Sequence, residues 1–198
     1  MQPLTIVPPG RLEQERTGLP KEPGPGAKSA GLFALLSEDF RTHDRRLNEP
    51  GFWAVAVHRV GTRVASLPSP LLRRLLSVPQ RVLSVAIDWT WGIQIPAEVS
   101  LGRRVRLWRS GGMLLVARSI GNDVQIRHGT TFGALRGSEH GRESLPVIED
   151  RVDIGSGVSI LGAVVVGHDA VISPNSVVLR DVAPGSRVLG VPARAVPS

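Results

Sequence analysis

The chain has 198 residues, of which 41% are hydrophobic, and a formal net charge of +7 at pH 7. This length allows one domain, or one domain with a helical appendage. The absence of cysteine excludes disulfides, thiolate catalysis and thiolate metal sites. No apolar run approaches the ~20 residues that cross a membrane, and no secretory signal opens the chain. Basic residues are not interleaved with aromatic residues as in nucleic-acid-binding segments. We therefore expect a cytoplasmic protein that has neither a membrane nor a nucleic acid as partner.

The first half of the chain predicts a tail followed by helices. Residues 1–30 are rich in Pro and Gly and poor in apolar side chains, so we expect a disordered tail. Residues 31–91 show apolar residues at helical spacing. One of these helices should end or kink at Pro79, because proline lacks the amide that continues a helix. The apolar face of that helix is formed by Leu71, Leu72, Leu75 and Leu76.

From about Ile93 to Val182 an aliphatic residue or Phe returns about every six positions, a period that is typical of a parallel β-helix. The repeat fits neither a helix nor a simple alternating strand. Gly, Asn and Asp cluster in the turns between the repeats. We predict three-sided coils with aliphatic columns inside, ended by Pro184-Gly185 and followed by a tail. The column positions are Ile95, Leu101, Leu107, Leu115, Ile120, Ile126, Phe132, Ile148, Ile154, Ile160, Val166, Ile172 and Val178.

Two segments interrupt this repeat. Residues 134–147 fit no repeat and must loop out of the coil, and loops that leave a rigid solenoid often build binding sites. Between Leu107 and Ile120 the chain holds one residue more than the repeat needs. We place the extra residue at Gly111-Gly112, because glycine lets the backbone absorb an odd step.

Particular segments of the helical region and of the coil carry a resemblance to a known family. They are residues 41–43, 50–59, 92–96, 126–133 and 178–185, and the closing motif Gly190-Val191-Pro192-Ala193-Arg194. Over residues 32–196 the chain resembles bacterial serine acetyltransferases. The repeats and the closing motif are specific for hexapeptide-repeat acyltransferases. They are less specific for serine as the acceptor, because polysaccharide and other small-molecule acetyltransferases share this layout.

The resemblance implies a left-handed parallel β-helix with an N-terminal α-helical segment. Residues 1–30 would be the tail, 31–91 the helical region, and 92–198 the acyltransferase β-helix with its C-terminal tail. Acetyl-CoA would serve as co-substrate between adjacent subunits of a homotrimer or a dimer of trimers, with no metal. We expect Trp108, Met113 and Leu114 near the face that the copies bury. In such enzymes a His, oriented by an acidic residue, takes the proton of the acceptor hydroxyl as it attacks the thioester, and backbone donors stabilise the oxyanion.

The chain departs from the family where this chemistry occurs. In an ungapped alignment the family's His falls on Arg109, its acidic partner on Gln94, and a second His on Leu145. A guanidinium keeps its proton and cannot act as a general base. Arg109 would instead hold a carboxylate or phosphate of the acceptor, or pair across the trimer interface. Gln94 would orient Arg109 or a substrate by hydrogen bonding.

The five histidines offer few replacements for the missing base. His128 is favoured, because it lies close along the chain to the expected CoA groove and neutral His titrates in a useful range. The alternative is a coil-surface residue that faces a neighbouring subunit. His140 with Glu143, in the extruded loop, is a second candidate. We interpret three others as structural: His43, His58 and His168.

The cofactor side of the family pattern is better kept. Small residues occur where the family lets pantetheine lie against the backbone, namely Gly133, Ala134, Ser156, Gly157, Ser173 and Pro174. Each glycine also fits an ordinary coil turn. Arg180 and Arg194 are candidates for the CoA phosphates. The favoured function is acyl transfer, with acetyl as the expected group, to a hydroxyl or amine of a small molecule. The alternatives are a catalytically silent homologue that binds CoA or a partner protein, and a purely structural trimer.

Overall fold

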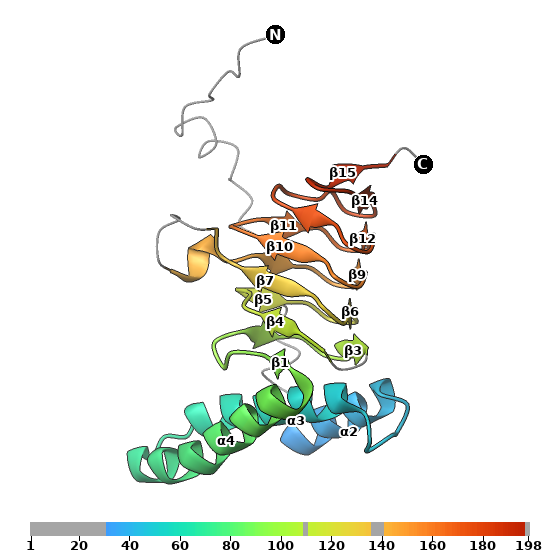
Figure 1. Cartoon of the computed structure of the whole chain (residues 1–198). Coiled ribbons are helices and arrows are strands. Elements are labelled where there is room, and N and C mark those ends of the chain that lie inside the picture. The colour runs from blue at the N-terminus through green and yellow to red at the C-terminus, as the bar shows by residue number, and fades with distance from the viewer. Residues whose placement is uncertain (1–30, 109–110, 136–140, 197–198) are drawn as a thin grey trace.

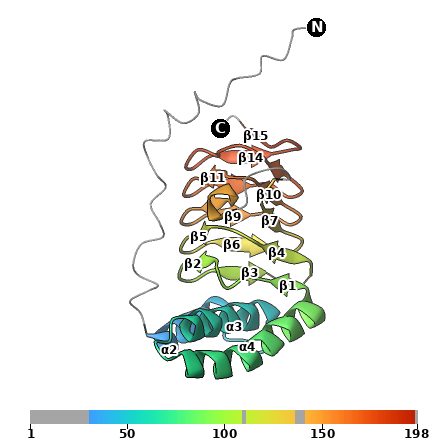
Figure 2. The same ribbon diagram turned by 90° about the vertical axis from the view of Figure 1, so that its left-hand side faces the viewer.

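The computed structural model describes residues 31–108, 111–135 and 141–196. Within them, three helices form a base and a stack of β-coils rises from it (Figure 1). Figure 2, from the side, shows the strands in successive layers above the helices. The predicted disordered tail at 1–30 lies outside the described residues.

The base consists of α2 (Leu32–Thr42), α3 (Pro50–Ala65) and α4 (Pro70–Trp91). Helix α4 begins at Ser69, whose hydroxyl accepts a hydrogen bond from the amide of Leu72, and it ends at Gly92 in the left-handed conformation. Helix α3 packs on both of the others, and it approaches α4 closely at Gly61. A Cβ on Gly61 would lie 2.5 Å from Nε2 of Gln80, so the end of this flexible side chain fills the space beside the glycine.

Helix α4 differs from the prediction in two ways. It runs through Pro79 instead of ending there, and the close approach of Gln80 to Gly61 holds the helix against α3 directly after the proline. In addition, its predicted apolar face is turned to solvent. Leu71 and Leu75 are 81% and 70% exposed, because the polar positions Ser77, Gln80 and Ser84 take the half-buried side toward α3.

Parallel strands form the three faces of the coil stack. Face A contains β1 (Ile93–Gln94), β4 (Met113–Leu115), β7 (Thr131–Gly133), β10 (Ser159–Leu161) and β13 (Val177–Val178). Face B contains β2 (Ser100–Leu101), β5 (Ser119–Ile120), β8 (Val147–Ile148) and β11 (Val165–Val166). Face C contains β3 (Arg106–Trp108), β6 (Gln125–Arg127), β9 (Asp153–Ile154), β12 (Val171–Ile172), β14 (Arg187–Leu189) and the antiparallel β15 (Arg194–Ala195).

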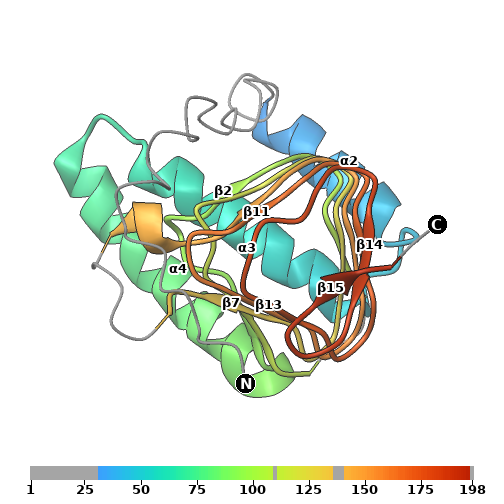
Figure 3. The same ribbon diagram turned by 90° about the horizontal axis from the view of Figure 1, so that it is seen from above.

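The predicted aliphatic columns form the core. Every predicted column position from Leu101 onward is buried, and Ile95 is partly buried. On face C, Leu107 lies in register with Ile126, which lies in register with Ile154. Figure 3, from above, shows the coils superposed in one three-sided outline. The six-residue repeat therefore predicts both the faces and the core correctly.

Both predicted interruptions are present. Gly111 and Gly112 have φ values of 125° and 61°, in the region that favours glycine, at the corner between Leu107 and Leu115. The segment that follows face A at Gly133 leaves the coil, carries the short 3₁₀ helix η2 (Arg142–Ser144), and rejoins at β8. Figure 1 shows η2 standing away from the stack.

The coil does not end at Pro184-Gly185 as predicted. Gly185 has φ 66°, and its amide donates to the carbonyl of His168, so the pair makes one more coil turn. Beyond it β14 joins face C, with Val188 in register with Ile172 and 5% exposed. A Pro-Gly pair that reads as a stop signal in the sequence is here an ordinary corner.

Buried polar contacts fasten the helical base to the first coil. Arg59 of α3 forms an ion pair with Asp39 of α2, and both side chains are buried. Nη2 of Arg59 also donates to the carbonyl oxygen of Gly102, at 2.8 Å. His43 bridges the same junction, because its Nδ1 donates to the carbonyl of Asp39 and its Nε2 accepts from the amide of Leu107. None of the helices in the described ranges has the length and apolar character needed to cross a bilayer.

Candidate active site

Most of the predicted site residues lie at the two corners that border face A. The first, the CA corner, joins face C to face A. It stacks Gly111, His128, Ser156 and Pro174 in successive coils. The amide of Gly129 donates to the carbonyl of Gly111, that of Gly157 to His128, and that of Asn175 to Ser156, at 2.8–2.9 Å. His128 and four predicted CoA residues therefore share one edge: Ser156, Gly157, Ser173 and Pro174.

The second, the AB corner, leads from face A to face B and is the place where the extruded loop leaves. Gly133 and Ala134 lie here, and the amide of Gly162 in the next coil donates to the carbonyl of Gly133 at 2.8 Å. Arg180 follows β13 at the same edge and is exposed. Arg194 does not join this group, because it belongs to β15 on face C.

His128 lies at the CA corner with an exposed ring. In the described parts of the chain no side chain forms a hydrogen bond with this ring. The neighbouring carboxylate of Asp153 is engaged by Arg127, whose Nη2 donates to Oδ2 at 3.4 Å. His128 is therefore accessible, but no acidic partner among the described residues orients it.

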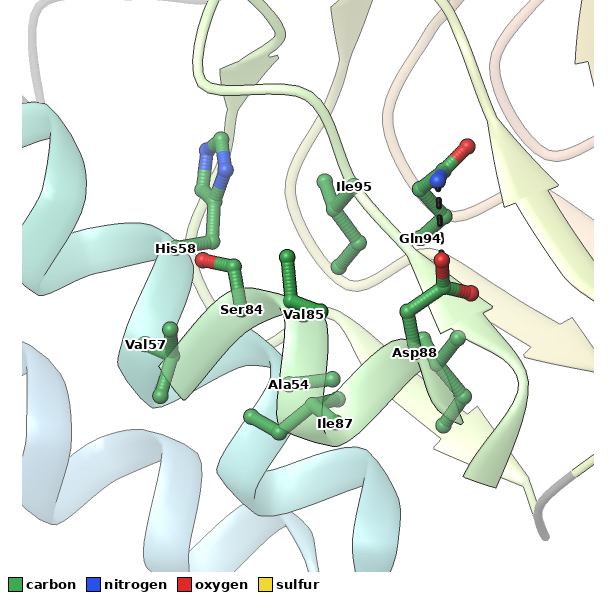
Figure 4. Close-up of a pocket in the computed structure, with 10 residues that line it drawn as sticks. Ala54, Val57, His58, Ser84, Val85, Ile87, Asp88, Gln94 and Ile95 are labelled. Atoms are coloured by element: carbon green, nitrogen blue, oxygen red, sulfur yellow. Dashed lines mark hydrogen bonds between the residues drawn. The ribbon is translucent and has the colours of Figure 1, made fainter. Parts of the chain in front are cut away.

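Gln94 extends from β1 and pairs with an acid that sequence reasoning missed. Its Nε2 donates to Oδ2 of Asp88 on α4, at 3.0 Å (Figure 4). A carboxylate therefore stands beside the position where the family resemblance places one. The sequence offers one signal, since Asp88 lies in the last turn of a helix that leads directly into β1.

Arg109 lies outside the described residues, and only its flanks are on view. Trp108 pairs in register with Arg127 on face C. Gly111 donates its amide to the carbonyl of Trp91 at 3.0 Å. Gly111 thus lies beside the end of α4, close in the chain to Asp88.

A pocket of about 110 Å³ opens between α3, α4 and β1. Its polar lining comes from His58, Ser84, Asp88 and Gln94, and aliphatic side chains form the rest (Figure 4). His58 is 5% exposed, and neither ring nitrogen has a hydrogen-bond partner in normal geometry. Burial, together with the charge of Arg59, lowers the pKa of His58 to about 4, although the nearby backbones of Ile95 and Val99 oppose the shift.

Of the remaining histidines, His43 and His168 form hydrogen bonds that stabilise the fold. Burial lowers the pKa of His43, and both of its nitrogens serve the junction described above. His168 is exposed, contacts Oδ2 of Asp169 through Nδ1, and donates its amide to Glu149. His140 lies outside the described residues, so the pairing of His140 with Glu143 stays a prediction.

A β-helix of six-residue repeats with small residues along its corners is the fold of hexapeptide-repeat acyltransferases. A comparison with models of known families found no match. Two relatives are serine acetyltransferases. That of Helicobacter pylori J99 is 32% identical over 175 residues, 85% of this chain and 95% of the relative. That of Mycobacterium tuberculosis H37Rv is 32% identical over 151 residues, 74% of this chain but only 61% of the relative.

Solved structures agree. The soybean serine acetyltransferase apoenzyme has a TM-score of 0.71 at 30% identity, covering 83% of this chain and 69% of that one. The Neisseria gonorrhoeae serine acetyltransferase has a TM-score of 0.69 at 28% identity, covering 84% and 66%. The chain belongs to the serine acetyltransferase family. The predicted family and the left-handed β-helix with N-terminal helices are confirmed, and membership assigns the chain to the acetyl-CoA-dependent acyltransferases.

Proposed function

We propose that this protein transfers an acetyl group from acetyl-CoA to a hydroxyl or amine of a small molecule. The observation that carries the proposal is the CA corner within this family's fold. There an accessible imidazole, His128, lies in the same edge as Ser156, Gly157 and Pro174, bordering face A. An edge with one titratable group and little side-chain bulk suits a thioester that must lie against the backbone.

The two corners suit the parts of CoA. A Cβ added to Gly133 would meet only Cδ2 of Leu161, at 4.0 Å, so the backbone there is open to a ligand. Gly133 with Ala134, and Ser156 with Gly157, Ser173 and Pro174, would flank the pantetheine arm. Arg180, exposed at the AB corner, would meet a phosphate. Arg194 is less well placed, because it lies on the far face.

The groups near face A favour an amine over a hydroxyl. A neutral amine attacks the thioester carbonyl carbon with its own lone pair, the carbon–sulfur bond breaks, and the CoA thiolate leaves. The surplus proton on nitrogen then passes to His128 or to solvent. A hydroxyl needs a base during the attack, and His128 has no orienting acid among the described residues. Arg109 would hold the anionic group of any acceptor that carries one.

The second candidate is a catalytically silent homologue that binds CoA or a partner protein. What favours it is the pair of substitutions at the family's catalytic positions, with Arg109 in place of His and Gln94 in place of the acid. A thiol-release assay with acetyl-CoA separates the two candidates when serine, small amines and sugars are offered in turn. Thiol release with at least one acceptor supports the enzyme, whereas CoA binding without turnover supports the silent homologue.

His128 has its own test. His128→Ala should lower turnover by ~10²–10⁴ while CoA still binds, which is the usual effect of removing a positioned acid–base group. His168→Ala is the matched control, because that histidine is exposed on a coil turn away from both corners. Full activity in His128→Ala would show that the acceptor needs no base from this residue.

We also propose a homotrimer or a dimer of trimers. Trp108 and Leu114 are 36% and 37% exposed and remain available to a neighbouring copy. Met113, expected beside them, is 2% exposed and belongs to the core, because side chains alternate along β4 and Met113 lies on the same inward side as Leu115. The outward apolar face of α4 adds surface for the same purpose. A monomer in sedimentation at micromolar concentration would contradict this proposal.

A further inference from the structure

We propose that the pocket between α3, α4 and β1 binds a small protonated amine that carries a second hydrogen-bonding group, such as an amino alcohol. The inference rests on the proposed function, because this ligand would be the acyl acceptor, whose ammonium gives one proton to the carboxylate of Asp88 before the neutral nitrogen attacks the thioester. Three features of the pocket carry it: an unsatisfied imidazole, a carboxylate as the only charged group in the described lining, and a small volume.

The imidazole is that of His58. It is buried at 5% exposure, and neither ring nitrogen has a partner in normal hydrogen-bond geometry, although the backbones of Ile95 and Val99 lie near the ring. An unsatisfied buried polar group is costly and rare, so in a native protein it points to a missing water or ligand. Since burial keeps this ring neutral, it offers one N–H donor and one acceptor. A hydroxyl, which both donates and accepts, can use either nitrogen.

The carboxylate is that of Asp88. Gln94 donates to Oδ2, and no described residue bonds to Oδ1. Figure 4 shows Asp88 on α4 and His58 on α3, at opposite sides of the pocket. Of the lining residues that the structure describes, Asp88 alone is charged. The pocket therefore favours a cation at the Asp88 side and a neutral polar group at the His58 side.

The volume and the aliphatic walls of the pocket further restrict the class of ligand that it can bind. A volume of about 110 Å³ exceeds the ~30 Å³ that one water takes up, and it suits a molecule of a few heavy atoms. Aliphatic side chains between the two polar ends, among them Val85 and Ile95, suit a short carbon chain (Figure 4). An amino acid such as serine would bring a carboxylate that no cation among the described lining residues can meet, and Asp88 would repel it. The pocket thus selects an amine without a carboxylate.

The position of the pocket fits an acceptor site. Gln94 belongs to β1, the first strand of face A, and face A lies between the two corners proposed to hold CoA. Gln94 thus lies in both the pocket lining and the face beside the cofactor. In this view Gln94 does not replace the family acid directly, but holds Asp88 toward the ligand.

The test measures binding to the full-length protein by calorimetry and by NMR of isotopically labelled histidine rings. Ethanolamine is the amine probe, serine the carboxylate-bearing probe and acetate the anion control. The ring signals of His58 are assigned as those that are missing in His58→Gln. We expect ethanolamine to shift these signals, and serine and acetate to leave them unchanged. Asp88→Asn should weaken ethanolamine binding roughly tenfold to hundredfold, as loss of a charged hydrogen bond does.

Glu98→Gln is the matched control for charge, since Glu98 is an exposed acid near the pocket that does not line it. It should change ethanolamine affinity less than about twofold. The inference is overturned if ethanolamine leaves the His58 signals unmoved, if Asp88→Asn binds as the wild type does, or if serine binds equally well. Should His58→Gln fail to fold, the Asp88→Asn comparison still decides, because that substitution keeps the shape of a half-buried side chain.

Thiol release is measured separately, so the two proposals can fail independently. Acetyl transfer to an amine without any effect at His58 would sink the pocket assignment and leave the proposed function standing. Ethanolamine binding at the pocket without acetyl transfer to any acceptor would remove the proposed function, and with it the acceptor role, while the amine site would remain.

Discussion

The β-coils and the helical base reach stability by opposite arrangements. The coils hide aliphatic columns inside and repeat the same contact in each layer, as with Leu107, Ile126 and Ile154. The base joins the coils through a buried ion pair and a buried histidine, and it turns the leucines of α4 outward. A repeated apolar contact tolerates the loss of one member better than a single polar junction does. The predictions below test that difference.

The largest effect is expected at Asp39. Asp39→Ala would leave Arg59 buried without its partner, and breaking such a pair costs about 3–5 kcal/mol of unfolding free energy. Because Arg59 also bonds the carbonyl of Gly102, the loss should loosen the base from the first coil. Urea unfolding measures the change. Glu38→Ala is the control, because the Glu38–Arg103 pair is partly exposed and should contribute about 1 kcal/mol or less. Equal losses in both variants would contradict a special role for the buried junction.

The second effect depends on pH and concerns His58. Its pKa is lowered from 6.5 to about 4 in the folded protein, so the unfolded chain binds a proton more readily. Stability is therefore unaffected above about pH 6.5, falls as the pH drops toward 4, and levels off below it, with a total loss of about 3 kcal/mol.

This effect can be separated from that of the carboxylates. The Arg104 guanidinium lowers the pKa of Asp123 below its ordinary value of 3.8, so the stability that Asp123 contributes is lost only at still lower pH. Unfolding midpoints between pH 7 and 4 should fall more steeply in the wild type than in His58→Gln. Parallel curves for the two proteins would show that His58 does not titrate with the expected shift.

A third prediction concerns the tight corners of the β-coils, where backbones of neighbouring layers lie close together. A Cβ on Gly102 would lie 2.3 Å from the carbonyl oxygen of Gly121 in the next coil. Since backbone cannot give way without moving a layer, Gly102→Ala should destabilise by about 1–3 kcal/mol, as overpacking does. Gly141→Ala, in the extruded loop with nothing within 4 Å of its Cβ, should leave the melting temperature unchanged. An unchanged melting temperature for Gly102→Ala would mean that neighbouring coils can move apart to accept the Cβ at little cost in free energy.

The sequence predicts the coils well because a repeat averages over many equivalent positions. One misplaced residue, such as Ile95 in its partly buried position, does not hide the pattern. The base has no repeat, so each contact must be found separately. Nothing in the spacing of Asp39 and Arg59 announces a pair, since they meet only once α2 and α3 pack. Met113 and the Pro184-Gly185 corner were misjudged for a related reason, because the register of Met113 with Ile93 and the extra layer of β14 appear only in the folded structure.

The candidate site follows the same division. His128, Ser156 and Pro174 fall on one corner because the repeat fixes which coil turns stack. The roles of Asp88 and His58 were not predicted from the sequence. The two residues line one pocket only because α3 and α4 pack against β1, and no repeat in the sequence indicates that packing. What sequence alone identifies here is the edge that we propose for CoA. The pocket that we propose for the acceptor depends on tertiary packing.

The smallest effect concerns the ion pairs on the coil surface. Arg104 and Asp123 form a bidentate pair between neighbouring coils, with Nε–Oδ1 and Nη2–Oδ2 distances of 2.6 and 2.7 Å, and both side chains are about 40% exposed. Because water screens such pairs, Arg104→Gln should cost at most about 0.5 kcal/mol at low salt. The difference from the wild type should vanish near 1 M salt, where the screening length is ~3 Å. Urea unfolding at two salt concentrations measures both values. A loss as large as that of Asp39→Ala would mean that the coils, like the base, depend on their polar contacts.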